Sequence, residues 1–360
     1  MNAIPSRAAD RPAATARPVT VALQGGGSLG AFAWGVLDRL LDLPDLRIAV
    51  VSGASAGAMN AAMVAQGLAV GGPEEAKRLL EVFWRRVAMA AGSPDFGGIG
   101  WALPFGGFMA PVADLLRQSS KTLPRRQVNP LGLNPLRGIL QGLYDPSVLG
   151  TAGAPSLIVS ATLVRTGEAR LFRDREVTTD ALLASACLPQ LFPPIRIEDE
   201  LYWDGGYASN PPLRPVIEAG APPDILLVRT TPVQRPDPPV SGTEVRERQN
   251  EMTFGAALRQ ELRSLAVAQC LLREMPEAPG VLGRLRDARL HVISAEEEFR
   301  TLKQGSHSDP SWGFLSQMRE LGHAAGDRWI AENLDAVGVR PTVDLCDFAG
   351  PVLDGPLRAA

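Results

Sequence analysis

A serine between two glycines stands where an apolar run meets a run of small residues. Residues 46–51 are apolar enough to predict a strand buried on both faces, and residues 55–66 predict a helix of small residues. Between them lies the stretch GASAG, which matches the pattern G-x-S-x-G. On a tight strand-to-helix turn, flanking side chains would collide with the strand and the helix, and the helix start offers free N–H groups to a developing negative charge. We therefore predict Ser55 as a nucleophile on a strained turn that Gly53 and Gly57 support.

Strand and helix patterns alternate along most of the chain. Strand patterns occur at residues 19–23, 46–51, 156–164, 195–203, 224–229 and 290–294. Helical patterns occur at residues 28–41, 55–66, 73–87, 179–187, 245–275 and 312–334. This alternation predicts an α/β fold with a mainly parallel sheet covered by helices on both faces. In the long helix, Phe254, Leu258, Leu262 and Leu265 recur at helical spacing and predict contact with the core rather than a membrane face.

Charge and hydropathy narrow the classes of function. The net charge of −3 over 360 residues gives no polybasic signal, so nucleic acid is not expected as a partner. No stretch approaches the roughly 20 uninterrupted apolar residues of a membrane span. Residues 1–17 lack the apolar segment of a signal peptide and are expected to be a disordered tail, with an organelle transit peptide as the weaker alternative. A cytoplasmic location is expected, and the three widely separated cysteines indicate neither a disulfide nor a metal site.

The glycine-rich stretch GGGSLG follows the first strand pattern. Consecutive glycines after a strand can direct several backbone N–H groups into one concavity, because no Cβ forbids the required conformations. Gly25, Gly26 and Gly27 are therefore predicted as an oxyanion hole beside Ser55, since the two strands would be neighbours.

The same letters also match the G-x-G-x-x-G pattern of a dinucleotide site. That site requires an acidic residue at the end of the second strand to hold the ribose. Here Asp42 and Asp45 precede that strand, at the wrong end, and Ser55 follows it. A dinucleotide site and a purely structural turn are therefore the weaker interpretations of this stretch.

A serine hydroxyl needs a partner that accepts its proton before it can attack a carbonyl. In the stretch YWDGG, Asp204 follows an aromatic strand end, and Gly205 and Gly206 leave room for close approach to it. Asp204 is therefore predicted as the base. The alternative is a Ser–Asp–His triad. The chain has three histidines, none in a motif-like context: His291, His307 and His323.

Residues 91–135 are dominated by glycine, proline and large apolar residues and show little periodicity. This apolar insertion is predicted to be either a lid or lipid-facing wall, or a loop tucked against the core. In the first case Trp101, Phe105 and Phe108 would bind substrate. Residues 232–244 predict a Pro-rich surface loop.

Together, GGGSLG, GASAG and DGG resemble the motifs of the patatin-like phospholipase family in order and spacing. The stretches ASACLPQLFPP, YWDGGYASNPPL and FLSQMRELGHAAGDRWI are also similar to bacterial members. The resemblance covers roughly residues 18–340 and implies a catalytic domain of that extent, folded as a three-layer α/β/α sandwich with a mainly parallel central sheet. Residues 341–360 are then a C-terminal tail.

The resemblance implies a serine lipid acyl hydrolase that acts through a Ser55–Asp204 dyad and an acyl-enzyme, with the three glycines as the oxyanion hole and with no cofactor or metal. Its substrates would be esters of phospholipids, lysophospholipids or neutral lipids, with transient contact to a membrane surface; the oligomeric state is left open. An acyltransferase with the same dyad, and a non-catalytic lipid-binding or scaffold protein, are the alternatives.

The glycine loop departs from the family pattern at two positions. The family loop often begins with Asp and carries Arg or Lys before its last glycine, whereas Gln24 and Leu29 stand at these places here. A missing cation would weaken electrostatic attraction for anionic substrates. Backbone N–H donors do not depend on it, so hydrolysis itself remains the expectation.

Overall fold

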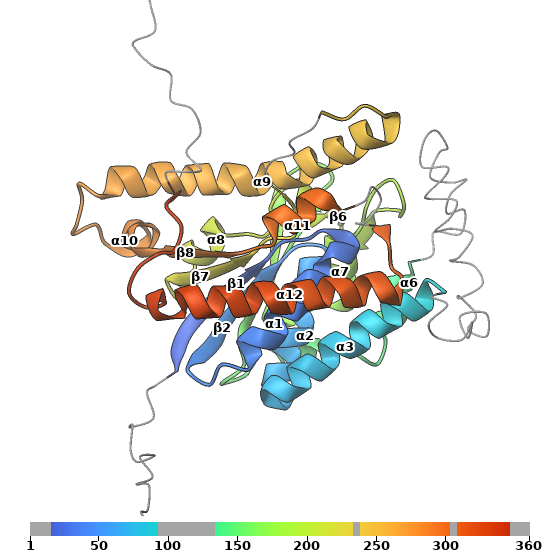
Figure 1. Cartoon of the computed structure of the whole chain (residues 1–360), viewed down its shortest axis with the longest axis horizontal. Helices are drawn as coiled ribbons and strands as arrows, with labels where there is room; N and C mark the ends of the chain where they lie inside the picture. The colour runs from blue at the N-terminus through green and yellow to red at the C-terminus, as the bar shows by residue number, and fades with distance from the viewer. Residues whose placement is uncertain (1–15, 93–133, 233–237, 303–307, 346–360) are drawn as a thin grey trace, which may run out of the picture.

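A mixed, mostly parallel sheet forms the centre of the molecule (Figure 1). The computed structural model describes residues 16–92, 134–232, 238–302 and 308–345. In these residues, eight strands follow the order β5-β6-β3-β2-β1-β7-β8, with β4 paired to β3. The strands are β1 (Arg17–Leu23), β2 (Leu46–Gly53), β3 (Ser156–Leu163), β4 (Ala169–Arg173), β5 (Ile195–Ile197), β6 (Glu200–Asp204), β7 (Asp224–Val228) and β8 (Arg289–Ile293). The β3-β2-β1-β7-β8 part is parallel, whereas β4 and β6 run antiparallel to β3, and β5 runs antiparallel to β6.

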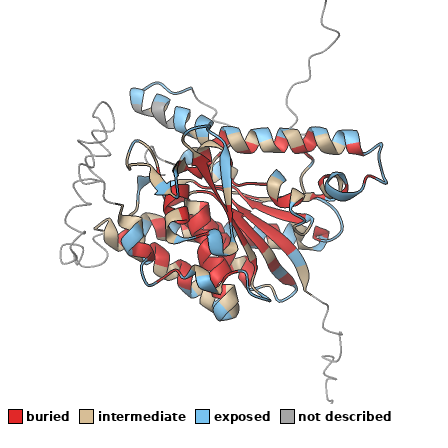
Figure 2. Ribbon diagram, turned by 180° about the vertical axis from the view of Figure 1, so that it is seen from behind, coloured by how far each residue is buried: buried red, intermediate tan, exposed pale blue. Residues whose placement is uncertain are grey.

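Helices cover both faces of this sheet and give the molecule three layers (Figures 1 and 2). One layer holds α1 (Gly30–Leu41), α2 (Ala56–Val70), α3 (Gly72–Ala90), α7 (Thr179–Ser185) and α12 (Trp312–Asn333). The other holds α8 (Arg214–Glu218), α9 (Gly242–Leu272) and α10 (Gly280–Asp287). Because side chains alternate along a strand, Val21 and Leu23 pack into the first core and Ala22 into the second. The predicted α/β/α sandwich with a mainly parallel sheet is confirmed.

Helices α1 and α12 pack closely through glycines. A Cβ on Gly35 would lie 2.0 Å from the carbonyl oxygen of Arg319, and one on Gly322 would lie 2.1 Å from that of Phe32. The contact also buries Asp38, whose carboxylate accepts hydrogen bonds from Arg319 and His323. The C-terminal helix is therefore fixed to the first layer by both shape and charge.

Several elements differ from the predictions. The helix α9 begins at Gly242, inside the predicted loop at 232–244, because Ser241 and Glu244 form a capping box. The edge strand β4 has the sequence ARLFR, without strict alternation of charged and apolar residues, and it was not predicted. The short helices α6 (Pro135–Leu140) and α11 (Glu296–Thr301) were also not predicted, nor was α10. The remaining predicted elements are present, with ends that shift by a few residues.

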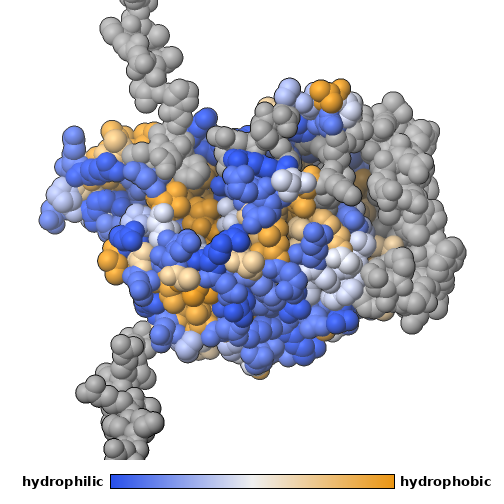
Figure 3. Space-filling view, viewed as in Figure 1, coloured by the Kyte–Doolittle hydropathy of each residue, from blue (hydrophilic) through white to orange (hydrophobic). Residues whose placement is uncertain are grey.

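The described residues include no helix long and apolar enough to cross a bilayer. The face of the molecule seen in Figure 3 is mainly hydrophilic and carries separate apolar patches. Most of the predicted apolar insertion at 91–135, and most of the two predicted tails, lie outside the described residues.

Candidate active site

Ser55 stands on a strained turn between β2 and α2. Its backbone has φ 55° and ψ −126°, a left-handed conformation that is rare for a residue with a side chain. A Cβ on Gly53 would lie 2.4 Å from the carbonyl of Gly57, and one on Gly57 would lie 2.1 Å from the carbonyl oxygen of Leu23. Both flanking glycines are thus required by close backbone packing, as the motif predicts. The side chain of Ser55 remains partly exposed at the start of α2.

Asp204 is the last residue of β6 and lies directly beside Ser55. Its Oδ2 accepts a hydrogen bond of 2.8 Å from the Ser55 hydroxyl, and its Oδ1 accepts one of 2.8 Å from the N–H of Gly206. The side chain is completely buried. Burial raises the pKa of Asp204 to about 7, and the two hydrogen bonds oppose this rise by stabilising the carboxylate. A carboxylate of this basicity is suited to accept a proton at neutral pH.

Antiparallel pairing of β6 with β3 brings the two residues together. In β3, Val159 pairs with Gly53 of β2 and Ala161 pairs with Asp204 of β6. Ser55, two positions beyond the end of β2, and Asp204, which ends β6, therefore meet near the carboxyl end of β3. The main chain of Asp204 is fixed on both sides, because its N–H donates to the carbonyl of Cys187 and its carbonyl accepts from the Thr162 hydroxyl, each at 2.8 Å.

A second serine contacts the nucleophile turn. The hydroxyl of Ser185, which is fully buried at the end of α7, accepts a hydrogen bond of 2.9 Å from the N–H of Ser55. The segment from Ser185 to Cys187 thus holds the backbones of both Ser55 and Asp204. Sequence reasoning assigned no role to Ser185, although it lies in the stretch ASACLPQLFPP that resembles family members.

The glycine loop lies next to Ser55, but its three N–H groups are not equivalent. A Cβ on Gly25 would lie 2.8 Å from the Cβ of Ser55, so the loop packs directly on the nucleophile turn. The N–H of Gly25 is buried and donates to Oδ1 of Asn210 at 2.7 Å. Its predicted use as an oxyanion donor is therefore corrected, since that donor is already engaged. Among the described residues, the N–H groups of Gly26 and Gly27 have no hydrogen-bond partner, and both glycines reach the surface.

The family model of the patatin-like phospholipases matches residues 21–217, more than half of the 360 residues. The chain belongs to the patatin-like phospholipase family. Membership supports a lipid acyl hydrolase activity in general. Among solved structures the chain is similar to VipD from Legionella pneumophila, with 16% sequence identity and a TM-score of 0.38, covering 87% of this chain and 66% of that chain. No sequence among the curated proteins matches the chain.

The two positions at which this patatin-like chain departs from the family loop are both buried. Oε1 of Gln24 accepts hydrogen bonds from the N–H groups of Thr230 and Thr231, at 3.0 and 3.3 Å, and from the Thr231 hydroxyl at 3.1 Å. The Thr230 hydroxyl in turn donates to the carbonyl of Gly25. Leu29 packs in the hydrophobic core. Gln24 thus ties the start of the glycine loop to the chain after β7, and position 29 offers no site for a cation at the surface.

The described histidines of this family member are engaged away from Ser55. His291 lies on β8 and contacts Asp224 at 3.1 Å. Asp224 is the first residue of β7. It lies at the amino-terminal end of the parallel strands, opposite to the end at which β2 leads into Ser55. His323 contacts Asp38 at 2.9 Å between α1 and α12. His307 lies outside the described residues, as do the predicted substrate-binding residues Trp101, Phe105 and Phe108.

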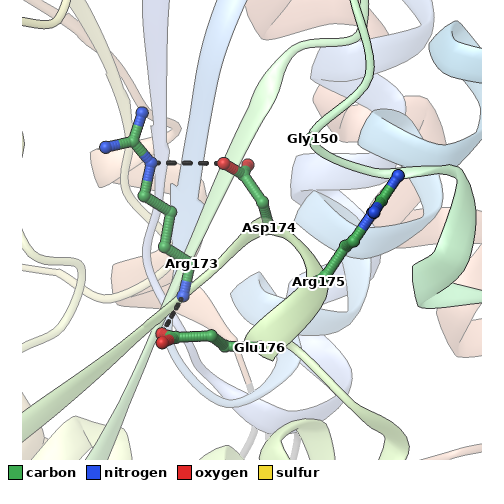
Figure 4. Close-up of a pocket in the computed structure, with 5 residues that line it drawn as sticks. All are labelled: Gly150, Arg173, Asp174, Arg175 and Glu176. Atoms are coloured by element: carbon green, nitrogen blue, oxygen red, sulfur yellow. Dashed lines mark hydrogen bonds and ion pairs between the residues drawn. The ribbon is translucent and has the colours of Figure 1, made fainter.

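A shallow depression lies at the other end of β3. It is lined by Gly150 and by residues 173–176, and Figure 4 shows their side chains. Arg173 donates to Asp174 through its guanidinium and to Glu176 through its backbone N–H. Asp174 also accepts from the N–H of Leu157. These polar groups bind one another, so the depression is a structural corner of the fold, away from Ser55 and Asp204.

Proposed function

We propose that this protein is a serine lipid acyl hydrolase that acts through a Ser55–Asp204 dyad. The observation that carries the proposal is the hydrogen bond of 2.8 Å between the Ser55 hydroxyl and a completely buried carboxylate. Nucleophile and base within this distance form the minimal arrangement for covalent acyl transfer. The strained turn and the adjacent glycine loop support the same assignment.

In the first half-reaction, Ser55 Oγ attacks the carbonyl carbon of a lipid ester while Asp204 accepts the hydroxyl proton. The carbonyl oxygen becomes an oxyanion, which the N–H groups of Gly26 and Gly27 stabilise. The tetrahedral intermediate collapses, the ester C–O bond breaks, and Asp204 returns the proton to the departing alkoxide. The products are an alcohol and an acyl ester on Ser55.

In the second half-reaction, water takes the place of the alcohol. Asp204 accepts a proton from the water as the water oxygen attacks the acyl carbon, and the same glycines stabilise the second oxyanion. Collapse releases the fatty acid and returns the proton to Ser55 Oγ. If a second alcohol reaches the acyl-enzyme before water, the same dyad performs acyl transfer instead.

A fluorophosphonate probe tests the nucleophile, and a short-chain p-nitrophenyl ester tests the base. The wild type should be labelled, and Ser55→Ala should not. Asp204→Asn should keep its fold, checked by circular dichroism, and lose turnover. Equal labelling of Ser55→Ala would reject the nucleophile, and near-normal turnover of Asp204→Asn would reject the base. Full activity after separate replacement of His291, His307 and His323 separates the dyad from a triad.

We assign binding of the acyl chain of the substrate to the apolar insertion at 91–135. Apolar side chains there would bind the acyl chain. They would also make transient contact with a membrane surface. Replacing Trp101, Phe105 and Phe108 with polar residues should reduce turnover of long-chain esters and spare short-chain esters. Equal loss on both would reject this assignment. Lipid binding without turnover of any ester would favour the scaffold alternative.

A further inference from the structure

The long helix α9 reaches the turn after Asp204 through Phe254, although it lies beyond the segment that matches the family model. A Cβ on Gly206 would lie 2.3 Å from Cδ1 and 2.7 Å from Cε1 of Phe254, and 3.0 Å from Oδ1 of Asp204. The phenyl ring and the carboxylate therefore flank a space no larger than one methyl group. Phe254 thus differs from Leu258, Leu262 and Leu265 of the same predicted stripe, which pack in the second core.

Two further contacts hold Phe254 in this place. Its carbonyl accepts a hydrogen bond of 3.2 Å from Nδ2 of Asn210, and Oδ1 of the same side chain accepts from the N–H of Gly25. Two turns along α9, Glu261 accepts from the Ser209 hydroxyl at 2.5 Å and from the N–H of Leu213 at 2.7 Å. The chain that follows Asp204 is therefore bound to α9 at two points, and Asn210 links α9 to the glycine loop.

The ring of Tyr207 completes an aromatic cover on the turn after Asp204. Its centroid lies 4.9 Å from that of Phe254, with the planes tilted by 43°. Both rings are partly exposed, whereas Asp204, Gly205 and Gly206 beneath them are buried. Water that approached the turn from the α9 side would have to displace Phe254. An apolar ring beside a carboxylate disfavours the charged form because it excludes solvent.

Several described titratable side chains on the neighbouring elements are engaged with other groups. On α9, Arg248 pairs with Glu251, and Arg259 donates to the carbonyl of Met252. The Tyr207 hydroxyl bonds Gln190, and the Cys187 thiol donates to the carbonyl of Pro193. The interactions that act on the pKa of Asp204 are its burial, the N–H of Gly206 and the Ser55 hydroxyl. Solvent exclusion is thus the dominant influence on this carboxylate.

We propose that Phe254 is a positioning residue of the active site, whose ring excludes water from Asp204 and thereby sets the pH range in which Asp204 accepts the serine proton. The inference rests on the proposed dyad. It assigns to α9 a role in catalysis in addition to its role in packing. Loss of the ring should let water reach the carboxylate and lower the pKa of Asp204 toward that of an ordinary aspartate.

The test is the pH profile of kcat/KM for a short-chain p-nitrophenyl ester, read at the isosbestic wavelength of the product. In Phe254→Ala, the midpoint of the rise in kcat/KM with pH should move to lower pH by about one unit. At pH values well below this midpoint, kcat/KM relative to its plateau should therefore be about tenfold higher than in the wild type. Phe254→Leu keeps an apolar side chain and should stay close to the wild type. An unchanged midpoint in Phe254→Ala, whatever its plateau, would overturn the inference.

Leu258→Ala provides the matched control, because it truncates a buried side chain of the second core one turn along the same helix. Its midpoint should equal that of the wild type. An equal shift in Leu258→Ala would assign the effect to general loosening of α9 and overturn the inference. Should Phe254→Ala not fold, Phe254→Gln supplies a polar side chain of comparable reach, and its midpoint decides in the same way. Failure of the dyad itself would appear separately, as normal turnover of Asp204→Asn.

Discussion

The hydroxyl of Ser185 accepts a hydrogen bond of 2.9 Å from the backbone N–H of Ser55. This bond joins the end of α7 to a residue whose φ of 55° is unfavourable for an L-amino acid. A strained turn persists only where surrounding contacts hold it. Ser185 is therefore part of the support that keeps the nucleophile presented, although its own side chain is fully buried.

Removal of this support should weaken both the fold and the acylation step. In Ser185→Ala the N–H of Ser55 loses its acceptor, which costs about 1–3 kcal/mol when a buried donor is left unsatisfied. The measurements are the free energy of unfolding in urea and the rate of labelling by a fluorophosphonate. Ser185→Cys retains a weak acceptor and should lie between Ser185→Ala and the wild type. A Ser185→Ala variant with wild-type labelling kinetics would contradict this role.

The raised pKa of Asp204 predicts opposite pH trends for stability and activity. Between the ordinary value of 3.8 and about 7, the folded protein binds a proton at Asp204 that the unfolded chain has released, so stability falls as pH rises through this window. The contribution, on the order of 4 kcal/mol, is fully present below pH 3.8 and lost above pH 7. Activity rises over the same window, because only the carboxylate accepts the serine proton.

The variant Asp204→Asn isolates this contribution. It carries no charge at any pH, so its free energy of unfolding should exceed that of the wild type by a larger margin at pH 8 than at pH 5. Urea denaturation of both proteins at the two pH values measures this margin, and other titrating groups cancel in the comparison. A margin that does not depend on pH would show that the carboxylate titrates as it does in water.

Space, rather than hydrogen bonding, should make Gly25 irreplaceable. A Cβ at this position would lie 2.6 Å from the carbonyl oxygen of Ala54 and 2.8 Å from the Cβ of Ser55. Gly25→Ala should therefore displace the nucleophile turn and reduce kcat/KM by about a hundredfold or more, on the scale seen when oxyanion stabilisation is lost. Gly313→Ala is the control, because a Cβ there would meet no atom within 4 Å apart from its chain neighbours and its own helix backbone. Comparable losses in the two variants would argue against steric displacement.

Gln24, which begins the glycine loop, should contribute to activity by holding the loop in place through its hydrogen bonds. In Gln24→Ala, the buried N–H of Thr230 loses its acceptor, so stability should fall by about 1–3 kcal/mol. kcat should fall more than KM rises, since the loop moves relative to Ser55 while the substrate path is unchanged. Thermal unfolding and steady-state kinetics measure the two effects. An unchanged melting temperature would show that the bonds of Gln24 are dispensable.

The sequence predicted Ser55 and Asp204 as a pair because local patterns mark both residues, and the fold places their side chains within hydrogen-bond distance. At Gly53, Gly57 and Gly205 a Cβ would collide with neighbouring backbone, so these positions require glycine and leave a readable motif. The alternation of strands and helices likewise predicted the layers. In contrast, the edge strand β4 has two adjacent apolar residues between Arg170 and Arg173, so it lacks the strict alternation that predicts a strand.

The contacts that complete the site were not predictable, because they join segments far apart in the chain. Asn210 meets Gly25 across 185 positions, and Ser185 meets Ser55 across 130. Helical spacing predicts that Phe254 contacts the core together with Leu258, Leu262 and Leu265. Spacing alone cannot show that Phe254 packs against the turn at Gly206 instead. Only the three-dimensional arrangement shows that the N–H of Gly25 is already occupied.

The family match ends at residue 217, yet Gln24 is bound by Thr230 and Thr231, and Asn210 is bound by Phe254. A segment cut at that boundary would carry Ser55 and Asp204 and lack the partners that hold the glycine loop and the turn after Asp204. Recombination between family members would have to exchange α9 together with the motifs it covers. The shortest segment that keeps these buried contacts is therefore longer than the segment that carries the motifs.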